Sequence, residues 1–229
     1  MLGLYMIYNL NMNGSAIHKV SAGVAFGVSI WAIFLLVSLL FLSPEFDPSL
    51  RPISDYALGD YGWVLSQLFF SWAISSWALA IALIPHLKKM SGKIGIVFLI
   101  LAGFGEFMGG LFDVTHPLHG MAFFIGVPCL PIAALFITSN LIKIKPWSQV
   151  KNRLRMSAHL TWISIVLMAV SIGIMFVGLT NAGITPGPEV TEIPDGVIVL
   201  SGWANRLLVI SYCAWVAIVS YYSLRSKKS

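Results

Sequence analysis

The chain has 229 residues, of which 58% are hydrophobic and only 10% are charged. A soluble globular domain carries roughly 25% charged residues because its surface faces water. This composition therefore excludes a soluble enzyme and a disordered tail. It also argues against a nucleic-acid partner, although the formal net charge is +5. The composition indicates a multi-pass protein of the cell membrane, with membrane lipids as its expected partners.

Six runs of the sequence are apolar and long enough to cross a bilayer. A hydrocarbon core of about 30 Å requires about 20 apolar residues in a helix, because backbone groups in lipid must bond within their own segment. The sequence therefore predicts an all-α, six-span transmembrane bundle. Residues 1–20 are expected to form a cytoplasmic N-terminal segment, and residues 225–229 a basic cytoplasmic tail. The predicted spans cover about 21–43, 62–86, 93–115, 118–142, 156–180 and 198–224.

The distribution of charge predicts how the spans are oriented. One set of span ends holds most of the basic residues and no acidic one: Lys19, Lys88, Lys89, Lys93, Lys143, Lys145, Lys151, Arg153, Arg155, Arg225, Lys227 and Lys228. The opposite ends hold most of the acidic residues: Glu45, Asp47, Asp55, Asp60, Asp113, Glu189, Glu192 and Asp195. Cytoplasmic loops collect Lys and Arg. Both termini are therefore expected in the cytoplasm, and the acidic ends outside the cell.

Glu106 is the only acidic residue deep inside a predicted span. An ionisable side chain in the bilayer costs a few kcal/mol, so it normally faces the bundle interior and has a partner. Glu106 and Asp113 are seven residues apart, which places them on one face of the third span if the helix continues. Gly105 and Gly109 form a small-xxx-small pair that allows a neighbouring helix to approach closely. The third span is therefore expected at the centre of the bundle.

A histidine-rich turn is predicted between the third and fourth spans. Pro117 disfavours helical geometry at the residue before it, so the third span should end there, and His119 falls in the first turn of the fourth. Asp113, His116 and His119 would then cluster around this turn. Two imidazoles and a carboxylate can hold a divalent metal or share a proton. The alternative is a hydrogen-bonded turn in which His119 serves the start of its own helix.

The long loop after the first span carries a second set of candidate residues. Three prolines restrict it, so we expect a folded lid rather than a flexible tether. Ser54 and Asp55 could supply a nucleophile and a general base beside His119, because a hydroxyl needs a base to activate it. They could equally form a turn or a helix cap.

Arg206 lies inside the sixth predicted span, after Gly202. An arginine there must either extend to the membrane surface or pair inside the bundle. Pairing with Asp113 or Glu106 is the favoured interpretation. Such a pair could be purely structural, or the guanidinium could bind an anionic headgroup.

Several short motifs resemble those of the uncharacterised prokaryotic membrane family known as domain of unknown function 998 (DUF998). They are residues 53–59 (Ile-Ser-Asp-Tyr-Ala-Leu-Gly), Gly109 to Asp113 closing the third span, His119-Gly120 opening the fourth, and Gly202 with Arg206 in the sixth. The resemblance covers roughly residues 20–225. It implies a membrane fold of six to seven helices and implies no reaction.

These residues together predict a polar site at the extracellular side of the membrane, built from Ser54, Asp55, Asp113, His119 and Arg206, with Glu106 beneath it. The first hypothesis is that this site binds a lipid-like headgroup and hydrolyses or transfers a group on it. His119 would then act as the base or as a metal ligand, and Arg206 would neutralise an anion. The second is a proton- or ion-coupled carrier in which Glu106 titrates. The third is a structural or sensory subunit without chemistry.

Overall fold

A computed structural model describes residues 2–187, 190 and 193–225. Within these residues the chain forms six long α-helices, two short 3-10 helices and no strand. All six long helices are long and apolar enough to cross a membrane, which confirms the predicted fold class. The elements are α1 (Leu2–Leu42), η1 (Ile53–Leu58), α2 (Gly62–Leu83), α3 (Met90–Leu111), α4 (His119–Leu141), η2 (Trp147–Val150), α5 (Lys151–Asn181) and α6 (Ser201–Arg225).

Helices α1 and α5 are longer than the sequence predicts, and α3 both begins and ends earlier. Residues 2–20 are helical and continue the first span as helix α1. Helix α5 begins at Lys151 rather than at residue 156. Helix α3 ends at Leu111 rather than at residue 115. Of the predicted basic tail, residues 226–229 lie outside the described part of the chain.

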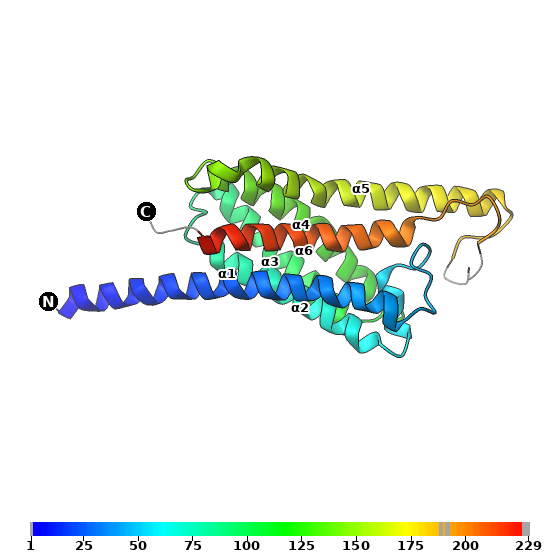
Figure 1. The fold of residues 1–229 in the computed structure, drawn as a ribbon, viewed down its shortest axis with the longest axis horizontal. Helices are drawn as coiled ribbons and strands as arrows, with labels where there is room; N and C mark the ends of the chain where they lie inside the picture. The colour runs from blue at the N-terminus through cyan, green and yellow to red at the C-terminus, as the bar shows by residue number, and fades with distance from the viewer. Residues whose placement is uncertain (1, 188–189, 191–192, 226–229) are drawn as a thin grey trace.

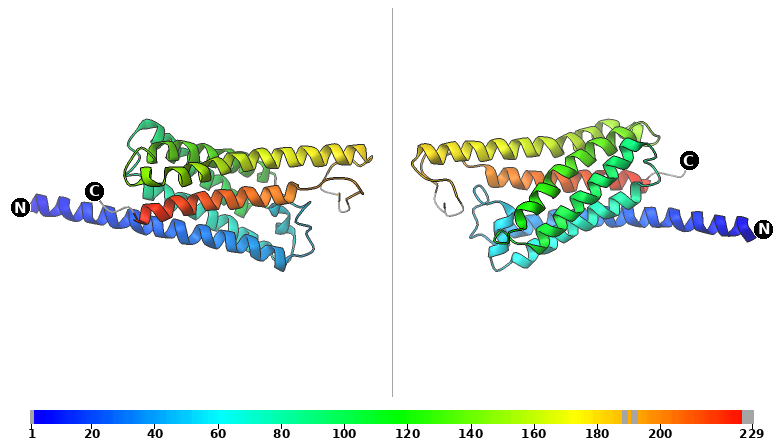
Figure 2. Two further views of the ribbon diagram at one scale, coloured as in Figure 1. Left: turned by 45° about the horizontal axis from the view of Figure 1, so that its top comes forward. Right: turned by 180° about the vertical axis from the view of Figure 1, so that it is seen from behind.

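The six helices form a closed ring in which each packs against the next along the chain and α6 packs against α1. Helices α2 and α6 also touch across the interior. The start of α1 and the end of α6 lie at one end of the bundle (Figure 1), which we call the terminal end. The opposite end, which we call the loop end, carries η1 and the connections α1–α2, α3–α4 and α5–α6 (Figure 2).

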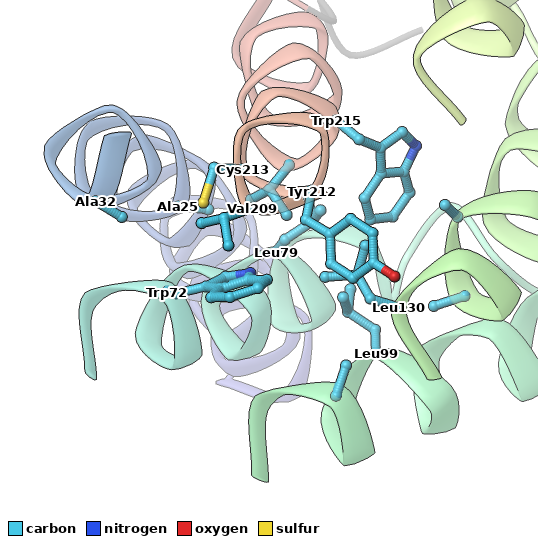
Figure 3. Close-up of a cluster of buried hydrophobic side chains, with 14 of the residues drawn as sticks. Ala25, Ala32, Trp72, Leu79, Leu99, Leu130, Val209, Tyr212, Cys213 and Trp215 are labelled. Carbon is cyan, nitrogen blue, oxygen red and sulfur yellow. The ribbon is translucent and has the colours of Figure 1, made fainter. Parts of the chain in front are cut away.

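Side chains on the outside of the ring are largely apolar. Helix α5 alone exposes Val166, Leu167, Val170, Ile174 and Val177. Water would disfavour such a surface, whereas lipid tails accept it. The interior contains large aromatic side chains, and Figure 3 shows Trp72 of α2 beside Tyr212 of α6, with Trp215 of α6 on the other side of Tyr212. Tyr212 and Trp215 each satisfy their polar atom by bonding α4, through Val127 O at 2.6 Å and Thr138 Oγ1 at 3.2 Å.

Helices α3 and α4 cross with almost no side chain between them at Gly105 and Gly126. A Cβ on Gly105 would collide with the backbone of Gly126 and would lie 2.8 Å from Ala122 O. Gly109 also meets a neighbouring helix, because its Cβ would lie 3.2 Å from the ring of Phe69 in α2. The close approach predicted from the small-xxx-small pair is therefore confirmed, and it brings Glu106 against α4.

Candidate functional site

A cavity of about 80 Å³ lies among η1, α2, α3, α4 and α6. Such a volume has room for several water molecules or for part of a small ligand. Four of its lining residues are polar: Ser54, Glu106, His119 and Asn205. Most of the others are apolar or aromatic, including Phe69, Trp72, Phe123, Val127 and Leu208. The cavity is therefore amphiphilic, and three of its four polar residues were predicted as site residues.

His119 has a fixed orientation at the start of α4. Its Nδ1 lies 2.8 Å from the carbonyl oxygen of Phe112. A carbonyl can only accept a hydrogen bond, so the proton of the neutral imidazole must be on Nδ1. The Nε2 lone pair is then free to accept a proton or a hydrogen bond. A free lone pair of this kind is one requirement of a general base.

Ser54 and Asp55 occupy the 3-10 helix η1 at the loop end, and both are half-buried. The backbone N–H of Ile53 donates to Asn205 Oδ1 at 2.9 Å, which holds η1 against α6. Ser54 lines the cavity. Asp55 pairs with Arg51 at 3.4 Å. Burial raises the pKa of Asp55, and the charges of Arg51, His119 and Arg206 oppose that shift.

Glu106 lies deeper than these residues, in the middle of the bundle. Its side chain is 4% exposed. Ser76 Oγ of α2 donates to Glu106 Oε2 at 2.8 Å. Within the described residues, Glu106 Oε1 has no hydrogen-bond partner. Because Glu106 lines the cavity, its interior placement agrees with what an acidic residue in a span requires.

Arg206 does not pair with an acidic side chain of the described residues, and its expected pairing with Asp113 or Glu106 is replaced by bonds to the first loop. Its Nη1 donates to the carbonyl oxygens of Pro48 (3.1 Å) and Arg51 (2.8 Å), and also to Gly202 O in its own helix. Its Nη2 donates to the hydroxyl of Tyr56 at 2.7 Å. The loop folds across the start of α6. It therefore places backbone carbonyl groups, rather than a carboxylate, within hydrogen-bond distance of the guanidinium. Arg206 is buried and does not line the cavity.

Asp113 lies outside helix α3 and is exposed, so it does not share a helix face with Glu106. Its Oδ1 accepts hydrogen bonds from Thr115 Oγ1 at 2.6 Å and from Thr115 N at 2.8 Å. These bonds lower the pKa of Asp113. An aspartate that bonds the backbone two residues onward competes with helix continuation. This local turn explains why α3 ends before residue 115.

The predicted metal ligands do not come together. His116 stacks on Phe112 with ring centroids 4.4 Å apart, and its Nδ1 accepts from the N–H of Leu118 at 3.2 Å. No three His, Cys, Asp or Glu side chains of the described chain could hold a metal ion together. The segment is therefore a hydrogen-bonded turn, as in the alternative interpretation, but His119 bonds Phe112 at the end of α3 rather than the start of its own helix.

A family model described as protein of unknown function (DUF998) matches residues 24–222. The chain belongs to the DUF998 family. The matched region contains η1, helices α2 to α5 and every residue that lines the cavity. No curated protein and no solved structure matches the chain.

The cavity of this DUF998 protein also contains residues that the sequence did not indicate. Trp72, Phe69 and Asn205 line it, and Ser76 bonds Glu106. Serine and aromatic residues are common throughout the spans and Asn205 is uncharged, so no charge or periodicity distinguishes these four. Tyr56 could have been identified, since it lies within the family motif at residues 53–59.

Proposed function

We propose that this integral membrane protein binds a lipid-like amphiphile in the cavity and hydrolyses or transfers an acyl group on it. One observation carries this proposal: Ser54, His119 and Glu106, which are distant in sequence, line one amphiphilic cavity. The aromatic and aliphatic walls accept the part of an acyl chain nearest the headgroup, and the polar residues face the headgroup itself. An amphiphile dissolved in the surrounding bilayer supplies both parts.

Ser54 acts as the nucleophile in this proposal. Its Oγ attacks the carbonyl carbon of an ester, and His119 Nε2 takes the hydroxyl proton. The alcohol leaves as the carbon–oxygen bond breaks, and it receives that proton from His119. Water then attacks the acyl-serine with His119 again as base, which releases the acid and restores Ser54. If another alcohol replaces water, the same steps transfer the acyl group.

Asp55 and the Nδ1 bond of His119 support these roles. The Nδ1–H to Phe112 O bond fixes the tautomer that leaves Nε2 free. Asp55 is electrostatically coupled to His119, so its carboxylate favours the imidazolium that forms during the reaction. Asp55 rather than Asp113 takes the role of the acid beside His119 in this proposal.

A fluorophosphonate probe tests the proposal, because it reacts covalently with activated serine hydroxyls. The full-length protein in phospholipid nanodiscs is treated with the probe, and the modified residue is located by peptide mass spectrometry. We expect the label on Ser54, with none in Ser54→Ala and at least about tenfold slower labelling in His119→Gln, since base assistance contributes 10²–10⁴-fold.

Ser66→Ala is the matched control, because Ser66 is a half-buried serine of α2 that does not line the cavity. It should label at the wild-type rate. An unlabelled Ser54, or equal labelling in His119→Gln and the wild type, contradicts the catalytic assignment.

A further inference from the structure

Two polar atoms on residues that line the cavity have no hydrogen-bond partner within the described chain. They are Glu106 Oε1 and Trp72 Nε1, and both residues are 4% exposed. Buried polar groups are normally satisfied, and an unsatisfied one costs about 1–3 kcal/mol, or more if it is charged. A guest with polar atoms therefore suits this cavity better than a purely apolar one.

No lysine or arginine is among the described residues that line the cavity. The guanidinium of Arg206 is already bonded to the first loop and to Tyr56. The carboxyl group of Glu106 consequently has no cationic partner from the cavity wall. Because acidic residues inside membranes normally pair with a positive or donor group, the missing partner can come from the guest.

The other walls favour a cation as well. The rings of Phe69 and Trp72 stack with centroids 6.1 Å apart and an interplanar angle of 14°. Aromatic faces attract ammonium groups, with tryptophan the most effective. The cavity thus combines the unpaired carboxyl oxygen of Glu106 with aromatic surfaces. An anion there would lie beside the carboxyl group of Glu106 without a compensating charge.

We infer that the cavity selects amphiphiles whose polar group is a primary amine over those that carry an alcohol or a carboxylate on the same chain. This inference rests on the proposed function, since it specifies the substrate class of that site. The ammonium donates to Glu106 Oε1, which leaves His119 Nε2 free to act as the base for Ser54. Hydrogen bonds between charged partners are roughly twice as strong as neutral ones, which gives the amine its advantage over the alcohol.

Three probes with one chain length test the inference: dodecylamine, dodecanol and dodecanoate. Each is titrated into the protein in phosphatidylcholine nanodiscs, and its Kd is obtained from the rise in the Tm of the protein. We expect the amine to bind about tenfold more tightly than the alcohol, and dodecanoate to produce no rise. In Glu106→Gln, which keeps the shape of the side chain and an acceptor for Ser76, the amine should lose about tenfold while the alcohol changes less than about threefold.

Asp60→Asn is the control, because Asp60 is an exposed acidic residue between η1 and α2 that does not line the cavity. It corrects for attraction of the amine to the protein surface and should leave all three Kd values unchanged. Equal amine affinity in wild type and Glu106→Gln overturns the inference, as does tighter binding of dodecanoate. The wild-type ranking of the probes tests it even if Glu106→Gln does not fold. If no probe binds, the inference fails, while labelling of Ser54 decides separately on the proposed function.

Discussion

Arg206 Nη2 donates a hydrogen bond of 2.7 Å to the Tyr56 hydroxyl, and its guanidinium lies 5.2 Å from the centre of the Tyr56 ring. Tyr56 belongs to η1, which also carries Ser54. The start of α6 also holds the loop between α1 and α2 by a backbone hydrogen bond, in which Gly202 N donates to Ser49 O at 2.8 Å. The position of Ser54 above the cavity therefore depends on contacts made by the sixth helix.

Removing the guanidinium should release this loop. Arg206→Gln leaves the carbonyl oxygens of Pro48 and Arg51 without their donor, so we expect a loss of about 3 kcal/mol in the free energy of unfolding. Tyr56→Phe removes one hydrogen bond and keeps the ring, and should cost about 1 kcal/mol. Unfolding by sodium dodecyl sulfate in mixed micelles measures both. Arg155→Gln, at an exposed arginine of α5, is the control. Equal stability of the two arginine variants would show that Arg206 does not hold the loop in place.

Gly202 should not tolerate even a methyl group. Its Cβ would collide with Pro48 O and would lie 2.6 Å from Arg51 O, both of which are backbone atoms. We expect Gly202→Ala to destabilise the protein by about 1–3 kcal/mol and to slow the labelling of Ser54. The control is Gly173→Ala in α5, where no atom of the described chain, apart from the adjacent backbone of α5 itself, lies within 4 Å of the added carbon. There, the higher helix propensity of alanine should leave stability unchanged or raise it by up to about 1 kcal/mol, and a similar loss in both variants would contradict the prediction.

The glycine pair at the α3–α4 crossing should respond asymmetrically. A Cβ on Gly105 collides with the backbone of α4, whereas a Cβ on Gly126 meets its nearest atom, Glu106 N, at an ordinary 3.4 Å. Gly105→Ala should therefore separate the helices and cost about 1–3 kcal/mol, while Gly126→Ala should be nearly neutral. Thermal unfolding of the two variants in nanodiscs compares them directly. Equal effects would mean that the crossing is looser than its backbone contacts indicate.

The six spans could be predicted because the bilayer imposes a length and a composition on each one. Glu106 could be placed in the interior for the same reason, since lipid does not accept a carboxyl group. Neither inference required knowledge of which helices are neighbours.

Other parts of the site depended on details that composition does not contain. Asp113 lies outside the third helix because its carboxylate accepts two local hydrogen bonds from Thr115. Arg206 bonds backbone carbonyl groups instead of an acidic side chain because the loop folds over α6. Every segment of a chain carries such carbonyl groups, whatever its side chains are. The partner of a charged residue therefore could not be deduced from a list of opposite charges. Trp72 and Ser76 reached the cavity through helix packing that no spacing of the sequence predicts.

The contribution of Asp55 to the stability of the protein should fall as pH rises above the ordinary pKa of this residue. Burial raises that pKa in the folded state, so the folded protein retains a proton that the unfolded chain has lost. The ordinary pKa of an aspartate is 3.8. Above this pH, ionisation of Asp55 stabilises the unfolded state relative to the folded state, until the carboxyl group of the folded protein also ionises. Asp55→Asn should remove this part of the pH dependence. Its Tm between pH 3.5 and 6 is compared with that of the wild type, and an unchanged slope would exclude Asp55 as its source.

The charge distribution along the chain leads to a prediction about sidedness. Of the described residues, the terminal end carries the basic set and the loop end carries Asp55, Asp60 and Asp113. By the tendency of basic residues to stay in the cytoplasm, the loop end and its cavity should face outside the cell. Single cysteines introduced at exposed positions test this, in a chain whose Cys129 and Cys213 are replaced by alanine.

In intact cells, a membrane-impermeant maleimide should modify Asp60→Cys at the loop end and should not modify Lys145→Cys at the terminal end. After permeabilisation both should react, because both positions are exposed in the structure. The reverse pattern would place the cavity on the cytoplasmic side. The amphiphile would then have to enter from the inner leaflet, and the acyl chemistry proposed for Ser54 would take place there.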